Sequence, residues 1–427
     1  MAPDVTFLVN NLWILIAGLL VFVMTIAVGF LEVGELGEDL WRSLHKTMLI
    51  TGIGLVIMVV VGFDTAFAPT VLDGFIGNPA YHGALIGGFD PTLSLSQWWS
   101  QTASGNGSEL TLGSYFLFED AFATVTLALV GVIVLRKMRL RAFLLYSIPY
   151  FAVIWALPAA WIWNPSGWLA KMGVVDFAGG LVVHGAAGAA GLGILWQIWR
   201  EEKARGLTES PSVPLKITPT WLTLGVLLLW VGWFGFNPGS VLQFNAEVPV
   251  VVLTTFLCAG TSYISTMGTK FLVIGKDPGM AFAANGIIMG LIVITPLAGF
   301  VSPGSAVILG IFCGPLFVVG EHAVSEVKWF TDPVGLLPGH LLGGIFGLMM
   351  IPVFAQNTYA ALSGAPGLPN GLLFGGGGAA VRQAGLEALA VVAVVAVVFV
   401  LSFVSVWVIA KILGGITRHP NSPEPQP

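Results

Sequence analysis

Eleven long apolar stretches constrain the fold of this chain more than any other feature of its sequence. A helix needs about 20 apolar residues to cross the hydrocarbon layer of a bilayer. Stretches of this kind lie near residues 9–31, 47–68, 113–135, 142–162, 174–199, 219–240, 250–271, 280–299, 304–320, 334–355 and 386–411. Only 9% of the 427 residues are charged, whereas soluble domains carry roughly a quarter. The sequence therefore predicts an all-α polytopic membrane protein with eleven transmembrane helices.

The positions of lysine and arginine predict the orientation of these helices. If the N-terminus is outside, 15 of the 17 basic residues fall on the cytoplasmic side, and only Lys171 and Arg382 do not. The 15 residues are Arg42, Lys46, Arg136, Lys137, Arg139, Arg141, Arg200, Lys203, Arg205, Lys216, Lys270, Lys276, Lys328, Lys411 and Arg418. Cytoplasmic loops of membrane proteins are rich in basic residues. This distribution favours eleven spans with the N-terminus outside and the C-terminus inside.

Several classes of function find no support in the sequence. The two cysteines, Cys258 and Cys313, lie in separate apolar stretches and are too few for a disulfide framework or a zinc site. The net charge is −5 and there is no basic tract, so we expect no binding of nucleic acid. The predicted spans contain no nucleophile–base pair, metal-ligand cluster or phosphate loop. We therefore expect no enzymatic activity, no cofactor and no metal.

Two of the six histidines lie inside predicted spans, and they do so in matching sequence surroundings. His184 follows Asp176 by eight residues, and His340 follows Asp332 by the same interval; glycines come four and seven residues after each histidine. The two segments belong to spans five and ten, which hold the same place in two halves of five spans each. An odd number of helices makes the second half inverted relative to the first.

This repeat predicts the domain organisation. Residues 1–411 form one membrane domain with inverted halves at about 9–199 and 219–355, followed by an eleventh helix at 386–411. The proline-rich residues 412–427 are predicted to form a short disordered cytoplasmic tail.

The inverted arrangement predicts that His184 and His340 meet near the middle of the membrane. Eight helical residues place each histidine roughly 12 Å beyond its aspartate, in a hydrocarbon core about 30 Å thick. Ionisable residues inside a membrane are costly and usually functional. A role in a pore is therefore favoured over a structural hydrogen bond to neighbouring backbone. Ligation of a haem by both histidines is a further interpretation, but residues 1–427 contain no second pair.

The chain resembles the ammonium transporters of the Amt/Mep/Rh family, and its Amt branch in particular. Residues 176–184 (DFAGGLVVH) are similar to the motif of the family's fifth helix, although Leu181 stands where threonine is common. Residues 233–240 (WFGFNPGS) are similar to the sixth-helix motif, and residues 284–303 resemble the eighth helix and its following loop. The likeness covers about residues 9–411.

The resemblance implies roles for residues at matching positions. His184 and His340 would line the pore, and Phe122 and Phe236 would form a gate on its outer side. Asp176 would organise the outer part of the pore without binding the substrate directly.

The resemblance also implies an outer site that binds ammonium through Trp163, Ser240 and Phe122. One extra residue separates Trp163 from the following aspartate relative to the family pattern. Trp161 and Trp168 are therefore alternative candidates. A tryptophan face attracts cations, and a serine hydroxyl accepts a hydrogen bond from ammonium.

Together these features predict an ammonium transporter or channel. A bare ion is costly in the apolar stretch beyond the gate, so ammonium would lose its proton and pass the histidines as NH3, with or without a relayed proton. Potassium, which has no proton to lose, would be rejected. The resemblance implies a multi-pass homotrimer in the bilayer of the plasma or inner membrane, with methylammonium as a substrate analogue.

Other features depart from the family pattern. Pro338 precedes His340, an aspartate common at Gly335 is missing, and the first cytoplasmic loop, residues 32–39, is acidic where relatives tend to be basic. Relatives that PII-type signal proteins block carry a longer segment after the last helix than the one after Lys411. Regulation by a PII-type protein is therefore not expected, unless a further module follows. An ammonium sensor that binds the ion but conducts little stays open as an alternative.

Overall fold

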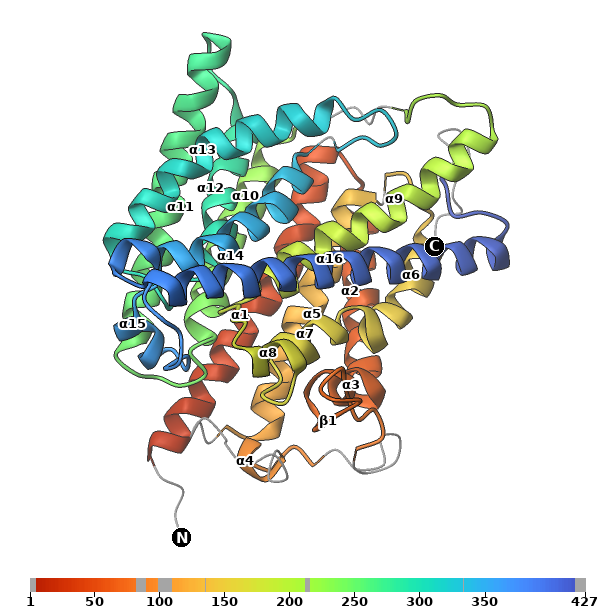
Figure 1. Ribbon diagram of the computed structural model, residues 1–427. Coiled ribbons are helices and arrows are strands. Elements are labelled where there is room, and N and C mark those ends of the chain that lie inside the picture. The colour runs from red at the N-terminus through yellow and green to blue at the C-terminus, as the bar shows by residue number, and fades with distance from the viewer. Residues whose placement is uncertain are drawn as a thin grey trace.

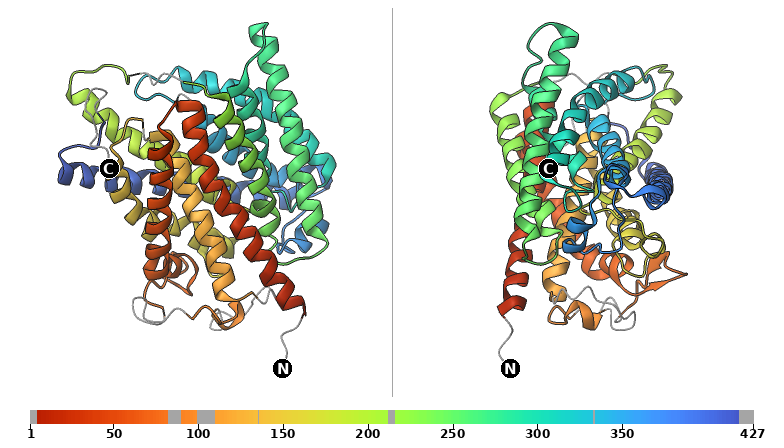
Figure 2. Two further views of the ribbon diagram at one scale, coloured as in Figure 1. Left: turned by 180° about the vertical axis from the view of Figure 1, so that it is seen from behind. Right: turned by 60° about the vertical axis from the view of Figure 1, so that its left-hand side comes forward.

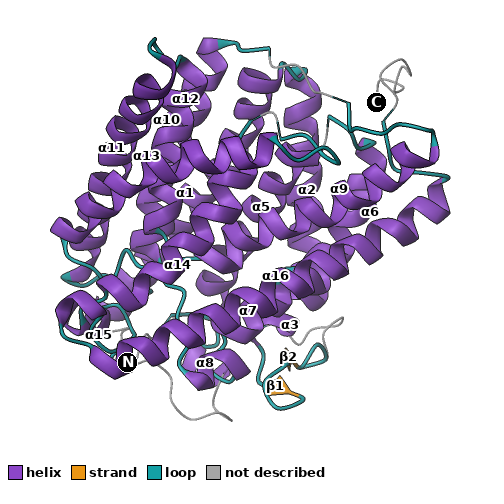
Figure 3. Cartoon of the chain, turned by 45° about the horizontal axis from the view of Figure 1, so that its top comes forward, coloured by secondary structure: helices purple, strands orange, loops and turns teal. Residues whose placement is uncertain are grey.

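A computed structural model describes residues 5–81, 90–98, 110–134, 136–211, 216–332 and 334–418. It is built almost entirely of helices, with one antiparallel pair of short strands, β1 (Thr70–Val71) and β2 (Ile76–Gly77) (Figures 1 and 3). Among the described residues, ten helical segments are long and apolar enough to cross a membrane. The apolar helix α12 (Met280–Ile294) has 15 residues, so the eleven predicted spans are consistent with the structure.

The first half of the chain supplies five of the ten long segments, and three of them combine α-helix with a π-helical turn. In order they are α1 (Val5–Leu36); α2 (Leu40–Ile57) with the π turn η1 (Met58–Gly62) and α3 (Phe63–Phe67); α5 (Leu112–Val134); α6 (Leu140–Pro149) with η2 (Tyr150–Ile154) and α7 (Ala156–Ile162); and η3 (Gly180–Gly185) with α9 (Ala186–Ala204). Two short helices, α4 (Leu95–Trp98) and α8 (Trp168–Met172), lie in the connections.

The second half repeats this plan and adds the last helix. Its segments are α10 (Pro219–Gly239), α11 (Glu247–Ile274), α12, α13 (Pro303–Ser325), the π turn η4 (Leu337–Leu342) with α14 (Gly343–Phe354), α15 (Asn357–Leu362), the 3-10 turn η5 (Leu372–Phe374) and α16 (Gly377–Leu413). Each half thus ends in a span that begins with a π turn, and each of these two turns carries one of the intramembrane histidines.

The segments that connect the long helices lie at the two ends of the bundle. The start of α1, the β1–β2 hairpin and α4 lie at one end, and the last turns of α9 lie toward the other (Figure 1). The predicted topology likewise places the N-terminus and the loop after the second span on the same side. Helix α16 crosses the outside of the bundle against α9 and α14, and is seen end-on in the right-hand view of Figure 2.

Glycines let the two halves approach closely at the histidine segments. A methyl group at Gly344 would overlap the carbonyl oxygen of Gly180 and press on the Cβ atom of His184, and one at Gly188 would overlap the side chain of Leu341. Small residues allow such backbone contact between helices in membranes. The packing therefore brings η3 of the first half against α14 of the second.

The boundaries of three predicted spans need correction. The second span was expected from residue 47, but α2 begins at Leu40, because the Asp39 carboxylate accepts a hydrogen bond from the N–H of Arg42 and caps the helix there. The fifth span was expected from residue 174, but its helix begins at Gly180 because Gly179 adopts a left-handed φ of 102° and interrupts the backbone. The predicted 12 Å of continuous helix between Asp176 and His184 is therefore wrong. The eleventh span was expected from residue 386, but α16 begins at Gly377. The polar side chains of Gln383 and Glu387 do not end the helix, because they bond to the backbone of Gly173 and Val175 in the loop before η3.

The acidic stretch predicted to be a loop also differs. Residues 32–36 belong to the last turn of α1, and Glu32 is buried in an ion pair with Lys46, which lies inside α2. The hydroxyl of Ser43 donates to the same carboxylate over 2.6 Å. Because the charges of Glu32 and Lys46 are paired with each other, both side chains can be buried at the inner ends of α1 and α2.

The described part of the predicted disordered tail is bound to the protein. Helix α16 continues to Leu413. The carboxylate of Glu201 then accepts hydrogen bonds from the backbone N–H groups of Ile416 and Thr417 and from the Thr417 hydroxyl. Composition alone suggested disorder, but these bonds fix residues 416–418. Residues 419–427 lie outside the described part of the chain.

Candidate pore between the two halves

The first histidine segment begins with a turn that one carboxylate caps. One Asp176 oxygen accepts hydrogen bonds at 3.1 and 2.7 Å, and the other at 2.8 and 2.9 Å. The donors are the backbone N–H groups of Gly179, Gly180, Leu181 and Val182. A helix start leaves these groups without partners. Burial raises the pKa of Asp176, whereas the four N–H groups stabilise its charged form and oppose the shift. Asp176 thus fixes the start of η3.

The second segment uses the same device. Asp332 accepts hydrogen bonds from the N–H groups of Leu336 at 3.1 Å and Leu337 at 2.7 Å. Burial raises the pKa of this carboxyl too, against the effect of its backbone donors. The two aspartates therefore have equivalent roles at the starts of η3 and η4, which carry His184 and His340. Pro338 lies in the first residues of η4, where a missing N–H costs little.

The two histidines meet directly. Nδ1 of His184 lies 3.1 Å from Nδ1 of His340, with ring centroids 5.1 Å apart, and both side chains are buried. In a hydrogen bond between two neutral imidazoles one Nδ1 donates and the other accepts, so the rings hold opposite tautomers. Among the described residues, Nε2 of His184 has no hydrogen-bond partner. One ring nitrogen of this pair thus stays available to a passing molecule.

Aromatic rings continue from the histidines in a row. Phe236 stacks on His184 with centroids 5.8 Å apart, and Phe122 lies 4.2 Å from Phe236. Trp163 meets the edge of Phe122 at 5.8 Å. Phe122 and Phe236 are 1% and 0% exposed. The two buried phenylalanines therefore lie between Trp163 and the histidine pair.

Of the three candidate tryptophans, the structure brings Trp163 to the phenylalanine pair. Its ring is half-buried, and its Nε1 donates to the carbonyl oxygen of Asp176 over 2.7 Å. Trp161 instead donates to the carbonyl of Phe75 and packs against Trp168 at 5.6 Å.

Ser240 ends helix α10 one turn after Phe236. Its hydroxyl donates to the Phe236 carbonyl over 2.9 Å. Because that bond uses the hydroxyl hydrogen, the lone pairs of the oxygen remain available to a donor.

Sequence reasoning missed Trp233 as a wall of the pore. Its ring stacks on His184 at 5.8 Å, and its Nε1 donates to the hydroxyl of Thr295 over 3.1 Å. Thr295 also bonds to Asn237, whose amide donates to Thr255. The quoted motif contains Trp233 and Asn237, but their place beside the histidine follows only from the partners that α11 and α12 supply.

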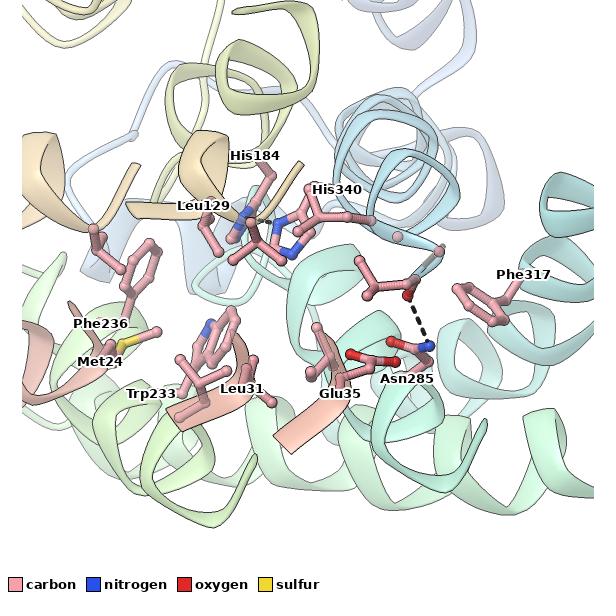
Figure 4. A pocket seen from close by; sticks show the side chains of 18 residues that line it. Met24, Leu31, Glu35, Leu129, His184, Trp233, Phe236, Asn285, Phe317 and His340 are labelled. Atoms are coloured by element: carbon pink, nitrogen blue, oxygen red, sulfur yellow. Dashed lines mark hydrogen bonds between the residues drawn. The ribbon is translucent and has the colours of Figure 1, made fainter. Parts of the chain in front are cut away.

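A narrow cavity of about 40 Å³ runs from the histidines toward the inner end of the bundle (Figure 4). Helix α1 lines it with Met24, Leu31 and Glu35, whose spacing puts them on one helix face. The eleven residue steps from Met24 to Glu35 span about 16 Å at 1.5 Å per residue. Phe236 and both histidines lie in the lining, but Phe122 does not. The cavity therefore begins on the inner side of the phenylalanine pair.

An all-helical membrane protein whose two halves join around buried imidazoles and a narrow cavity has the architecture of a channel or transporter. The sequence profile of the Ammonium Transporter Family matches residues 12–421, and this chain belongs to that family. Because its members are transporters, the expectation of a transport protein and not an enzyme is confirmed, and family membership implies ammonium as the substrate.

Relatives of known name agree with this assignment. The chain is 29% identical to an ammonium transporter of Bacillus subtilis over 95% of this chain and 92% of that protein. It is 30% identical to an ammonium transporter of Aquifex aeolicus over 95% and 88%.

Solved structures share the fold. The crystal structure of Mep2 from Saccharomyces cerevisiae has a TM-score of 0.80 at 24% identity, covering 97% of this chain and 88% of that one. A protein described as a sensor Amt protein has a TM-score of 0.81 at 23% identity, with 99% of each chain covered.

Proposed function

We propose that this protein carries ammonium across the membrane by binding NH4+ outside the phenylalanine pair, removing a proton, and passing NH3 along the histidines. The continuous row from Trp163 through Phe122 and Phe236 to His184 and His340 is the observation that supports this most. We place the protein in a plasma or inner membrane, as a homotrimer that also accepts methylammonium.

The outer end of the row suits a cation. The half-buried ring of Trp163 supplies a negative face, and cation–π attraction contributes about 2 kcal/mol when the ion is desolvated. The lone pairs of Ser240 and the face of Phe122 would complete the site. Such a site concentrates NH4+ without requiring the charge to go further.

The inner part of the row suits neutral ammonia. Both phenylalanines are buried, and the cavity beyond them is lined mainly by apolar side chains. Since desolvation favours the neutral form of an amine, NH4+ is expected to lose its proton at this boundary, either to water on the outer side or to the histidine pair. The unpaired Nε2 of His184 can then exchange a hydrogen bond with NH3, and the shared Nδ1 bond offers a path for a relayed proton.

The test is current from purified protein in proteoliposomes after an ammonium jump, with potassium as the control ion. We expect an ammonium-dependent signal that potassium does not produce. His184→Ala should reduce ammonium passage about tenfold or more, because a buried hydrogen-bonding group is lost from the path. Unchanged ammonium passage together with unchanged exclusion of potassium in His184→Ala would contradict the mechanism.

An ammonium sensor is the second candidate. The contact between Phe122 and Phe236 closes the outer mouth, which fits a site that binds the ion and passes little of it. A pH-sensitive dye inside the vesicles separates the candidates. Electroneutral NH3 entry raises the internal pH without current. A sensor binds ammonium saturably, in dependence on Trp163 or Ser240, with neither current nor pH change.

A further inference from the structure

Three glutamates lie at the inner end of α1 or directly after it, and one of them differs from the others in its partners. Glu32 is paired with Lys46, and Glu38 lies within 3.8 Å of basic groups of Arg42, Arg136 and Arg418. The side chain of Glu35 makes no hydrogen bond or ion pair with any residue that the structure describes. It is nevertheless only 6% exposed.

The carboxylate of Glu35 belongs to the wall of the pore cavity. Figure 4 shows it among the side chains that line the cavity, together with the amide of Asn285 and the two histidines. The rest of the inner lining is apolar and includes Leu31, Ile288 and Phe317. A charge that faces such walls without a partner is costly unless a counter-ion or hydrogen-bond donors reach it.

The position of Glu35 at the end of helix α1 also makes an uncompensated negative charge on its side chain unfavourable. Glu35 lies in the last turn of α1, and the C-terminal end of a helix carries partial negative charge that favours cations. Burial alone would favour the protonated carboxyl, but the helix end, the unpaired carboxylate and the negative charge of Asp332 nearby together favour a cation at this point.

Asn285 adds an oxygen acceptor to the same cavity. Its Nδ2 donates to the carbonyl of Val334 over 3.0 Å, which fixes the amide and leaves its oxygen as an acceptor. Ammonium offers N–H donors to both oxygens, whereas a neutral molecule would leave the carboxylate charge uncompensated.

The cavity lies next to a wider pocket of the inner surface. Gly335 lines both the cavity and this pocket, which is bordered by Lys270, Glu321 and Asp332. In that pocket Lys270 is already paired with Glu321 at 2.7 Å. This lysine therefore does not compensate the charge of Glu35.

We propose that Glu35, together with Asn285, forms an inner subsite that binds the ammonium ion where the pore opens to the inner side. The choice of ligand rests on the proposed function, but the subsite itself rests on the unpaired carboxylate in the cavity. It makes the two ends of the pore chemically different: an aromatic face binds the ion outside, and a carboxylate binds it inside.

The experiment compares ammonium flux in right-side-out and inside-out membrane vesicles, with ammonium chloride as the probe and potassium chloride as the control. Glu35→Gln keeps the shape of the side chain and removes its charge. We expect the half-saturating ammonium concentration to rise about tenfold in inside-out vesicles, since a charge-assisted hydrogen bond is lost, and to stay unchanged in right-side-out vesicles. Glu35→Asp retains the carboxylate and should restore part of the affinity.

Glu209→Gln is the matched control, because it removes the same charge from an exposed residue of the loop after α9. It should behave as the unaltered protein in both preparations. Equal half-saturation for Glu35→Gln and the unaltered protein in inside-out vesicles would overturn the subsite. So would an equal rise in both preparations, which would indicate a general loss of the fold.

Infrared difference spectra of the purified protein test the Glu35 subsite independently of the proposed transport function. Addition of ammonium chloride should perturb a carboxylate band, and Glu35→Gln should abolish that change. If the unaltered protein shows no ammonium flux at all, the transport proposal fails, but the change in the carboxylate band still tests whether Glu35 binds ammonium. A spectrum that is the same in Glu35→Gln would refute the subsite whatever the flux.

Discussion

Single residues along the aromatic row and the cavity differ in whether a protein partner satisfies their polar atoms. Nε1 of Trp233 and Nε1 of Trp163 each have a protein partner, so these rings are held in place. Nε2 of His184 and the carboxylate of Glu35 have none among the described residues. Polar groups that are buried without a partner are costly, and in a transport path a passing ligand can supply the missing bond.

Gly344 lies where the two histidine spans cross, and a side chain has no room there. Gly344→Ala should destabilise the protein by about 1–3 kcal/mol, because its methyl group would overlap the Gly180 carbonyl. Gly385→Ala in α16 is the control, since a Cβ there meets no atom within 4 Å. Thermal unfolding in detergent should show a lower midpoint for the first variant only. An unchanged midpoint for Gly344→Ala would mean that the halves can separate slightly at no cost.

At the scale of elements, both histidine spans begin with a π turn. In each case an aspartate carboxylate accepts hydrogen bonds from backbone N–H groups at the start of the turn. A π turn widens the helix locally and is often found at functional sites. Here it is anchored by a side chain that precedes it in sequence. The position of each imidazole thus depends on a carboxylate that is itself outside the span.

The two caps should contribute to a similar extent. Asp176 accepts four backbone hydrogen bonds, and Asp332 accepts those of Leu336 and Leu337, while the N–H groups of Val334 and Gly335 also stabilise its charge. Replacing either by asparagine turns one acceptor oxygen into a donor and leaves N–H groups unpaired. At about 1–3 kcal/mol for each unpaired group, both Asp176→Asn and Asp332→Asn should lower the unfolding midpoint. An unchanged midpoint for either variant, measured in the same detergent, would contradict this account of the caps.

Helix α16 and the residues after it form a second connected element. Glu201 of α9 holds the backbone of Ile416 and Thr417, and Arg139 donates to the carbonyls of Gly415 and Thr417. Glu201→Ala should release this segment. Hydrogen exchange of the Ile416 and Thr417 amides should become faster, while exchange in α9 stays slow. The Arg418 amide, which donates to the carbonyl of Lys137, serves as an internal reference. Unchanged exchange at 416 and 417 would show that the bonds of Arg139 and Arg418 are enough to hold the segment.

At the scale of the whole molecule, the outer surface of the bundle is strongly apolar. Large exposed side chains occur on α11, α13 and α16, for example Ile264, Val319 and Val392. Lipid or neighbouring copies of the chain must cover these faces. From family membership we predict a homotrimer, so light scattering in detergent should give a protein mass three times the 45.0 kDa of one chain. A protein mass of one chain would contradict the trimer.

The sequence predicted the helical membrane fold well because backbone groups in lipid must be satisfied within helices, which makes long apolar stretches informative. The repeated spacing from aspartate to histidine also predicted that His184 and His340 would approach each other. The π turns were not predictable, since they depend on carboxylate caps and on packing between halves. Glu35 looked like one more charge of an acidic loop. Only the fold separates it from Glu32, because Lys46 reaches one carboxylate and not the other.

The hydrogen bond between the two histidines joins residues that are 156 positions apart in the chain. At about 5–20 residues per second, a ribosome makes the second histidine roughly 8–30 s after the first. During that interval α10 and α12 are made, but η4 with His340, which completes the cavity wall, is reached only at its end. A cavity lined by both histidines therefore cannot form before synthesis has reached the tenth span.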